Sequence, residues 1–146
     1  MRVVLDTNVL VSALIKAGKP RELILKIAEK KVQVIISREI LEEFVEITDE
    51  PRIGRYVRVG DKITFLKAIG SIANLVKVRS KFKVVKEDPT DDIVLRTAHD
   101  GKAGYVVSGD RHLLSLKKFR KIRIVTVSHM LDILYSGHVL RKTNQD

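Results

Sequence analysis

Short apolar runs rich in β-branched residues alternate along the chain with segments that repeat their apolar residues at helical spacing. The runs are continuous, without interleaved polar residues, which is typical of strands covered on both faces. The expected strands are residues 3–5, 32–36, 75–78, 105–107 and 122–127, and the expected helices are residues 9–16, 21–30, 39–48, 62–72, 91–102, 111–116 and 129–135. This order predicts an α/β domain with a mainly parallel central sheet between helical layers.

The chain of 146 residues has the size of one domain, which we expect over residues 1–140, with a frayed tail over 141–146. Residues 49–61 carry Pro51, Gly54 and Gly60 among charged side chains and are expected to form an exposed connection. Residues 76–84 alternate basic with mostly apolar side chains, as an edge ribbon with one basic face would.

Two segments concentrate basic residues, and each has two readings. The first is the expected ribbon, with Lys77, Arg79, Lys81 and Lys83, and the second holds Lys117, Lys118, Arg120, Lys121 and Arg123. Lysines on an edge strand discourage aggregation, whereas a basic face also suits contact with RNA.

Charge and cysteine content narrow the classes of partner and of metal site. Lys and Arg outnumber Asp and Glu by 28 to 18, and the net charge of +10 favours either a nucleic-acid partner or simple solubility. Without cysteine the chain has no disulfide and no thiolate metal site, as is usual for cytoplasmic proteins. No apolar run reaches the roughly 20 residues that span a membrane, so we expect no membrane segment and a cytoplasmic protein.

Two aspartates follow expected strands directly. Asp6 comes after the strand 3–5, and Asp110 follows the strand 105–107 by way of Ser108 and Gly109. Parallel strands bring the residues after them to one edge of the sheet, where ligands bind. The alternative for each is helix capping, because aspartate is a good N-cap residue.

The segment "SREILEEFVEI" places one glutamate beside the apolar arc of an expected helix. Glu43 lies at the edge of that arc, whereas Glu42 and Glu46 point farther toward solvent. Glu43 is therefore the glutamate able to face inward, and its alternative is the solvated border of an apolar stripe.

The segment "DPTDDIVLRTAHD" contains a second such acid. Asp91 precedes Val94, Leu95 and Ala98 by three, four and seven residues, so it projects from the middle of the buried face. Asp92 lies off that face. A carboxylate aimed at a core must be paired, protonated or bound to metal, although a capping role in the first helical turn remains the alternative.

Four carboxylates at one sheet edge repel one another unless a divalent cation holds them ionised. Oxygen ligands without cysteine or clustered histidine favour Mg²⁺ or Mn²⁺. Ions of this kind assist phosphodiester hydrolysis, and a basic surface around them would hold the nucleic-acid backbone.

The motifs "LDTNVLVSAL", "SREILEEF", "DPTDDIVLRTA" and "YVVSGDRHLL", in this order from residue 2 to about 134, resemble the PIN-domain family. The closest likeness is to its branch of VapC-like toxins of prokaryotic toxin-antitoxin systems. The resemblance implies a three-layer α/β/α fold and an Mg²⁺- or Mn²⁺-dependent ribonuclease specific for single-stranded RNA. It also implies a homodimer.

The resemblance carries the family's four acids over to matching positions. The catalytic and metal-binding candidates are Asp6, Glu43, Asp91 and Asp110, and the supporting candidates are Thr7, Asn8, Ser108 and Asp92. In this chain His112 stands where many relatives have a further acid, and the participation of Asp88, Asp92 and His112 is left open.

The resulting hypothesis is a metal-dependent endoribonuclease that acts as a toxin and is neutralised by a cognate antitoxin. One alternative is an RNA-processing PIN nuclease without an antitoxin. Another is a catalytically silent RNA-binding module whose acids merely cap helices.

Overall fold

The computed structural model describes the backbone of residues 1–85 and 89–145 and the side chains of residues 1–85 and 91–136. Its central sheet has six strands in the order β3-β2-β1-β4-β6-β5. The strands are β1 (Arg2–Leu5), β2 (Gln33–Ser37), β3 (Ala73–Val76), β4 (Tyr105–Val107), β5 (Lys118–Phe119) and β6 (Ile122–Val125). All neighbours pair in parallel except β5 and β6, which pair antiparallel. The predicted mainly parallel sheet is confirmed.

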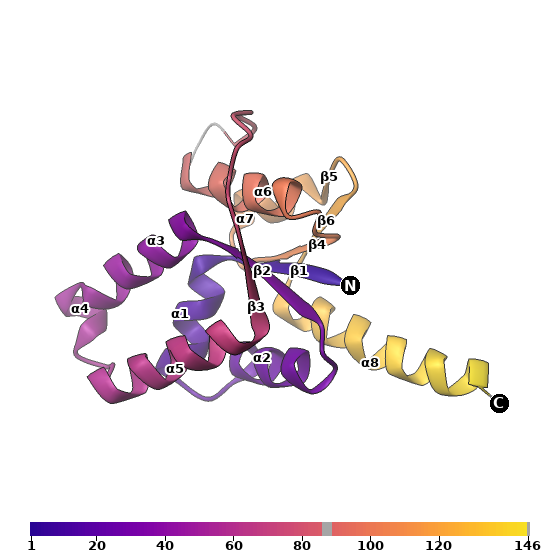
Figure 1. Cartoon of the computed structure of the whole chain (residues 1–146), viewed down its shortest axis with the longest axis horizontal. Helices are drawn as coiled ribbons and strands as arrows, with labels where there is room; N and C mark the ends of the chain where they lie inside the picture. Colours follow the sequence, from indigo (N-terminus) through magenta and orange to yellow (C-terminus); the bar gives the residue numbers. More distant parts are fainter. Residues whose placement is uncertain (86–88, 146) are drawn as a thin grey trace.

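Helices cover both faces of this sheet, which gives the expected three layers. They are α1 (Thr7–Ile15), α2 (Lys19–Glu29), α3 (Arg38–Asp49), α4 (Pro51–Gly54), α5 (Val59–Ile72), α6 (Pro89–Asp100), α7 (Arg111–Leu116) and α8 (Val127–Gln145). In Figure 1, α6 lies on one side of the sheet and α1, α2 and α8 lie on the other. None of the helices within the described residues is long and apolar enough to cross a membrane.

The core is aliphatic and lies where β1, β2 and β4 meet the helices. Val3, Val4 and Val106 are fully buried, as the continuous apolar runs predict. The end of α6 packs so closely on β2 that a Cβ at Gly101 would overlap the side chain of Ile35. Only glycine therefore fits at this position without displacing the sheet.

A buried hydroxyl pair joins the start of α3 to α6. The Thr97 hydroxyl lies 2.8 Å from Ser37 Oγ and 2.7 Å from the carbonyl oxygen of Ile93. Thr97 has one proton, so it donates to the carbonyl and accepts from Ser37. Ser37 Oγ also accepts from the Ile40 amide at 3.4 Å and caps α3. These bonds hold α3 and α6 in place relative to each other.

The predicted edge ribbon over residues 76–84 is wrong. The strand β3 ends at Val76, and residues 77–85 form no strand, although the exposure of their side chains still alternates. Their amides bind side chains of α6 instead: Arg79 and Ser80 donate to Asp100, and Val84 and Val85 donate to Asp92. Side chains of α6 therefore supply the hydrogen-bond acceptors for these four amides, in place of a neighbouring strand.

Two other boundaries differ from expectation. The connection expected over residues 49–61 contains α4 and the start of α5, because Pro51 suits the first position of a helix. The backbone of α8 runs far beyond the predicted 129–135, to Gln145. The frayed tail over 141–146 stays a prediction, because the side chains of 141–145 and all of Asp146 lie outside the described residues.

Candidate active site

The candidate site lies where the chain leaves β1 and β4 at their carboxyl ends. β1 pairs with β2 on one side and with β4 on the other, so the connections after β1 and β4 diverge and leave a crevice between them. Asp6 follows β1, and its amide donates to the carbonyl oxygen of Val107 at the end of β4 at 2.9 Å. The predicted meeting of these two strand ends is confirmed.

The side chain of Asp6 turns away from its own helix. Asp6 occupies the N-cap position of α1, yet its carboxylate makes no capping hydrogen bond. Its Oδ2 instead accepts a hydrogen bond of 2.7 Å from the hydroxyl of Ser108, and only 5% of the residue is exposed. The main hydrogen-bond partner of this buried acid is therefore Ser108 at the end of β4, and not the start of its own helix.

The surroundings of Asp6 disfavour its charged form. Burial raises the pKa of Asp6 above its ordinary value, and the charge of Asp110 raises it further. The hydroxyl of Ser108 and the nearby amides of Thr7 and Asn8 act in the opposite direction without reversing the shift. A cation beside Asp6 and Asp110 would favour the ionised carboxylates.

Asp110 has two roles in the structure. Its Oδ1 accepts from the amides of His112 and Leu113 at 2.8 and 3.2 Å, so it caps α7 as the alternative interpretation predicts. Its charge also acts on Asp6. Between them the fully buried Ser108 accepts from the Asp110 amide at 2.9 Å and donates to Asp6. One hydroxyl thus joins the two strand ends.

Glu43 is half-buried while Glu42 and Glu46 are exposed, in agreement with the predicted helical phase. The hydroxyl of the fully buried Thr7 donates to Glu43 Oε2 at 3.2 Å. Because Thr7 directly follows Asp6, this bond connects α3 to the end of β1.

The two aspartates at the start of α6 are both buried, with 5% of Asp91 and 4% of Asp92 exposed. The inward projection of Asp91 agrees with its predicted place on the buried face. Asp92 is buried by a different contact, which its predicted place off that face did not indicate: its Oδ1 accepts from the amides of Val84 and Val85 at 2.8 and 2.9 Å. Asp88 lies outside the described residues.

The supporting residues Asn8 and Ser108 line one pocket of about 280 Å³ together with Gly109 and residues at the start of α8. Asn8 is exposed, so its amide is open to a ligand that enters this pocket. His112 contributes its backbone amide to the Asp110 cap. None of the candidate acids lines this pocket, which is connected to them through the hydrogen bonds of Ser108 with Asp6 and Asp110.

Glu39 is a further acid that the sequence analysis did not single out. It lies one helical turn before Glu43 on α3, and its Oε2 is buried without a hydrogen bond from any described residue. The spacing of four residues between Glu39 and Glu43 could have drawn attention to it, because it places both on one helix face.

The chemistry of these side chains fits a hard divalent cation, since every candidate donor is oxygen and Asp6 and Asp110 repel each other. Among the described residues, however, no three His, Asp or Glu side chains already stand close enough to enclose an ion. The structure thus brings Asp6 together with Asp110 and joins Thr7 to Glu43. It does not show Glu43 or Asp91 as further ligands at the pair.

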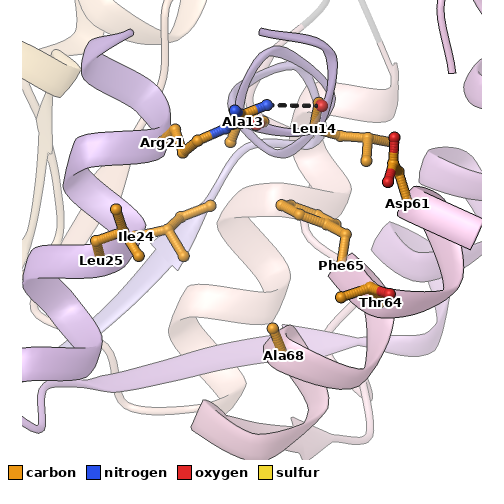
Figure 2. A pocket seen from close by; sticks show the side chains of 9 residues that line it. All are labelled: Ala13, Leu14, Arg21, Ile24, Leu25, Asp61, Thr64, Phe65 and Ala68. Atoms are coloured by element: carbon orange, nitrogen blue, oxygen red, sulfur yellow. Dashed lines mark hydrogen bonds between the residues drawn. The ribbon is translucent and has the colours of Figure 1, made fainter. Parts of the chain in front are cut away.

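A second cavity, of about 390 Å³, lies between α1, α2 and α5 and is mainly apolar (Figure 2). The guanidinium of Arg21, which lines this cavity, donates to the carbonyl oxygens of Ala13 and Leu14 at 2.8 and 2.9 Å. The guanidinium of Arg21 therefore satisfies carbonyl oxygens in the last turn of α1. Asp61 is the one acid among the residues that line the cavity.

Comparisons with known proteins agree with this architecture. A family model described as PIN domain matches residues 2–112. An uncharacterized protein of Methanocaldococcus jannaschii is 30% identical over 132 residues, which cover 89% of this chain and 84% of that protein. A chain in the crystal structure of VapBC2 from Rickettsia felis bound to a DNA fragment from their promoter superposes with a TM-score of 0.59 at 14% identity. That match covers 86% of this chain and 98% of the other, and it shows a shared fold.

Proposed function

The chain belongs to the PIN-domain family, a family of nucleases, and from this membership we propose that it is a metal-dependent endoribonuclease that cleaves single-stranded RNA. The observation that carries the proposal is the buried Asp6, held by Ser108 beside the charge of Asp110. A purely structural aspartate at a helix start would be held mainly by the amides of that helix, whereas the strongest hydrogen bond of the Asp6 carboxylate comes from Ser108. This favours a nuclease over a silent module.

In the proposed mechanism Asp6, Asp110, Asp91 and Glu43 would hold Mg²⁺ or Mn²⁺. When bound, such an ion supplies Lewis-acid chemistry for the hydrolysis of a phosphodiester by water. Ser108 orients the Asp6 carboxylate through its hydroxyl, and Thr7 orients Glu43. The exposed Asn8 would contact the RNA strand at the neighbouring pocket that it lines.

We further propose that the enzyme is the toxin of a toxin-antitoxin pair and acts in the cytoplasm as a homodimer. The likeness of its fold to a chain from VapBC2 supports this. The cognate antitoxin would cover or enter the acidic site with its C-terminal segment. A neighbouring gene for a small protein would favour this role, and its absence would favour RNA processing.

Cleavage of a labelled single-stranded RNA with Mn²⁺ tests the catalytic proposal. Asp6→Asn and Asp91→Asn should each lower the rate at least about 100-fold, because each removes a charged oxygen from the site. Glu43→Gln should also lower it, whereas Glu46→Gln, an exposed position on the same helix, should not. Assays with EDTA measure the cleavage that does not depend on metal.

Cleavage by Asp6→Asn and Asp91→Asn at the parent rate would overturn the assignment of the site. The toxin role is tested separately by expression in a bacterial host. The parent should arrest growth, Asp6→Asn should not, and co-expression of the product of the adjacent gene should restore growth. Growth that stays unaffected by an active parent enzyme would contradict the toxin role.

A further inference from the structure

The two basic segments of the sequence, which lie about forty residues apart, meet in the structure. The rings of Phe82, from residues 77–85, and Phe119, from β5, have centroids 5.0 Å apart. The guanidinium of Arg120 lies 4.9 Å from the centroid of the first ring and 5.0 Å from that of the second. The segments therefore form one surface, which neither the fold nor the acidic site explains.

A pocket of about 560 Å³ opens on this surface, between the end of α6 and the turn that joins β5 to β6. We call it the basic pocket; its lining residues are Ala98, His99, Lys102, Ala103, Arg120, Lys121 and Ile122. Its three cationic side chains, Lys102, Arg120 and Lys121, belong to exposed residues. The pocket is thus concave, accessible and positively charged.

Within the described part of the chain no salt bridge pairs the three cations of the basic pocket, and the nearby acid Asp100 interacts electrostatically with His99. The salt bridges that the structure shows there lie in α2, in α3 and around Glu50 and Lys62, and none includes Lys102, Arg120 or Lys121. The nearby Asp100 uses its Oδ2 to accept from the amides of Arg79 and Ser80 and from the hydroxyl of Ser80. An external anion is the natural counterion of such a pocket.

The backbone at the basic pocket is held in an unfavourable conformation. Lys102 and Arg120 have φ angles of 55° and 56°, in the left-handed region that glycine and asparagine adopt at lower cost. Lys117, at the start of the same hairpin, has a φ of 59°.

Arg120 is preorganised for contact with nucleic acid. Two aromatic rings lie beneath its guanidinium, and its Nη1 lies 3.0 Å from Nε2 of His99. Little side-chain entropy is then left to lose when the guanidinium binds a phosphate. A concave, positively charged pocket suits the flexible backbone of an unpaired strand better than a regular duplex.

We propose that the basic pocket is a second RNA-binding site, which holds the backbone of a single strand away from the acids. It lies at the amino-terminal ends of β4 and β6, whereas Asp6 and Asp110 lie at the carboxyl edge. The twelve residues of α6, which joins the two edges, span roughly 18 Å, so one strand that contacts both sites must run along the outside of the molecule. The choice of RNA as the ligand rests on the proposed ribonuclease function.

The experiment measures binding of a fluorescent single-stranded RNA to the full chain in EDTA, over a series of salt concentrations. Lys102→Gln should weaken binding about fivefold and reduce the slope of log K against log salt by about 0.7, the value for one lost phosphate contact. Arg120→Gln should weaken binding at least as much. Thermal unfolding of each variant checks that it is folded.

Lys31→Gln is the matched control. Lys31 is an exposed lysine with a φ of 56°, so its substitution removes the same charge from the same backbone conformation outside the basic pocket. It should leave affinity and salt slope within about 1.5-fold of the parent values, since a distant surface charge contributes little.

Equal RNA affinity of Lys102→Gln, Lys31→Gln and the parent would overturn the proposal. That result would favour a protein partner for this surface. Equal competition by a duplex RNA of the same length would overturn the preference for a single strand. Because binding is measured in EDTA, the result is independent of catalysis. A parent that binds but does not cleave with Mn²⁺ would instead contradict the proposed function.

Discussion

Among individual residues, Ser108 contacts both Asp6 and Asp110 through a single hydroxyl. The Ser108 hydroxyl lowers the pKa of Asp6, whereas burial raises it. The same hydroxyl accepts a hydrogen bond from the amide of Asp110. Ser108→Ala should therefore raise the pKa of Asp6 further and weaken metal binding. We expect a loss of activity of about 10- to 100-fold and a pH profile shifted to higher pH.

The measurement is the rate of Mn²⁺-dependent RNA cleavage as a function of pH. Ser115→Ala is a suitable control, because Ser115 is exposed and its hydroxyl only donates to the carbonyl oxygen of His112 within α7. An unchanged pH profile in Ser108→Ala would show that the hydroxyl does not tune the acid.

Asp6 also makes the stability of the protein depend on pH. Because the pKa of Asp6 is raised on folding, its protonated form stabilises the fold below the unfolded pKa, near 3.8. That contribution is lost as pH rises through the folded pKa, so ionised Asp6 lowers the free energy of unfolding at neutral pH. Asp6→Asn, which carries no charge and can still accept from Ser108, should be more stable than the parent at pH 7.5.

Urea unfolding in EDTA at pH 7.5 and at pH 4 measures this difference. The advantage of Asp6→Asn should shrink at the lower pH, where the parent approaches its protonated form. A variant that is less stable than the parent by the same amount at both pH values would contradict this account of Asp6.

Among the elements, α6 organises the irregular segment beside it. One carboxylate oxygen of Asp92 on this helix accepts hydrogen bonds from the amides of both Val84 and Val85. Asp92→Asn keeps an oxygen able to accept both bonds and should retain cleavage within about threefold, whereas Asp92→Ala leaves two buried or partly buried amides unsatisfied. The alanine variant should lose about 1–3 kcal/mol of stability.

Thermal unfolding and cleavage assays on both variants measure these effects. If Asp92→Asn loses cleavage as completely as Asp91→Asn, then Asp92 acts through its charge and belongs to the catalytic acids.

The elements also show what the sequence can and cannot predict. Asp6 has its predicted place at a strand end, and Glu43 and Asp91 have the predicted inward orientation, because strand ends and helical phase are local properties. The role of Asp92 could not be predicted, because its partners are amides of a segment without regular structure. The side chains of residues 77–84 alternate in exposure as their sequence pattern predicts. That pattern does not indicate whether the backbone amides donate their hydrogen bonds to a strand or to a helix.

Contacts between distant residues set the same limit for the site. The bond between Ser108 and Asp6 joins positions 102 residues apart. The sequence predicts that both lie at one sheet edge, since both follow parallel strands. Which hydroxyl meets which carboxylate depends on the order of β1 and β4 in the sheet.

For the whole molecule, a net charge of +10 coexists with buried acids at the carboxyl edge of the sheet. An ion bound there should stabilise the folded chain, because it relieves the repulsion between Asp6 and Asp110. At an ion concentration 100 times its Kd, the stabilisation should be about 2.7 kcal/mol.

Thermal unfolding with increasing Mn²⁺ tests this expectation. The midpoint of the parent should rise by several degrees, whereas that of Asp6→Asn should barely change. An equal rise in both proteins would place the ion elsewhere.

The position of β1 between β2 and β4 also has a consequence during translation. The hydrogen-bonding partner of Asp6, Ser108, is made about 5 to 20 s after Asp6, at ordinary rates of synthesis. A nascent or truncated chain that ends before β4 carries Asp6 and Glu43 without Ser108 or Asp110. The acid pair therefore forms only after β4 and the residues that follow it have been synthesised.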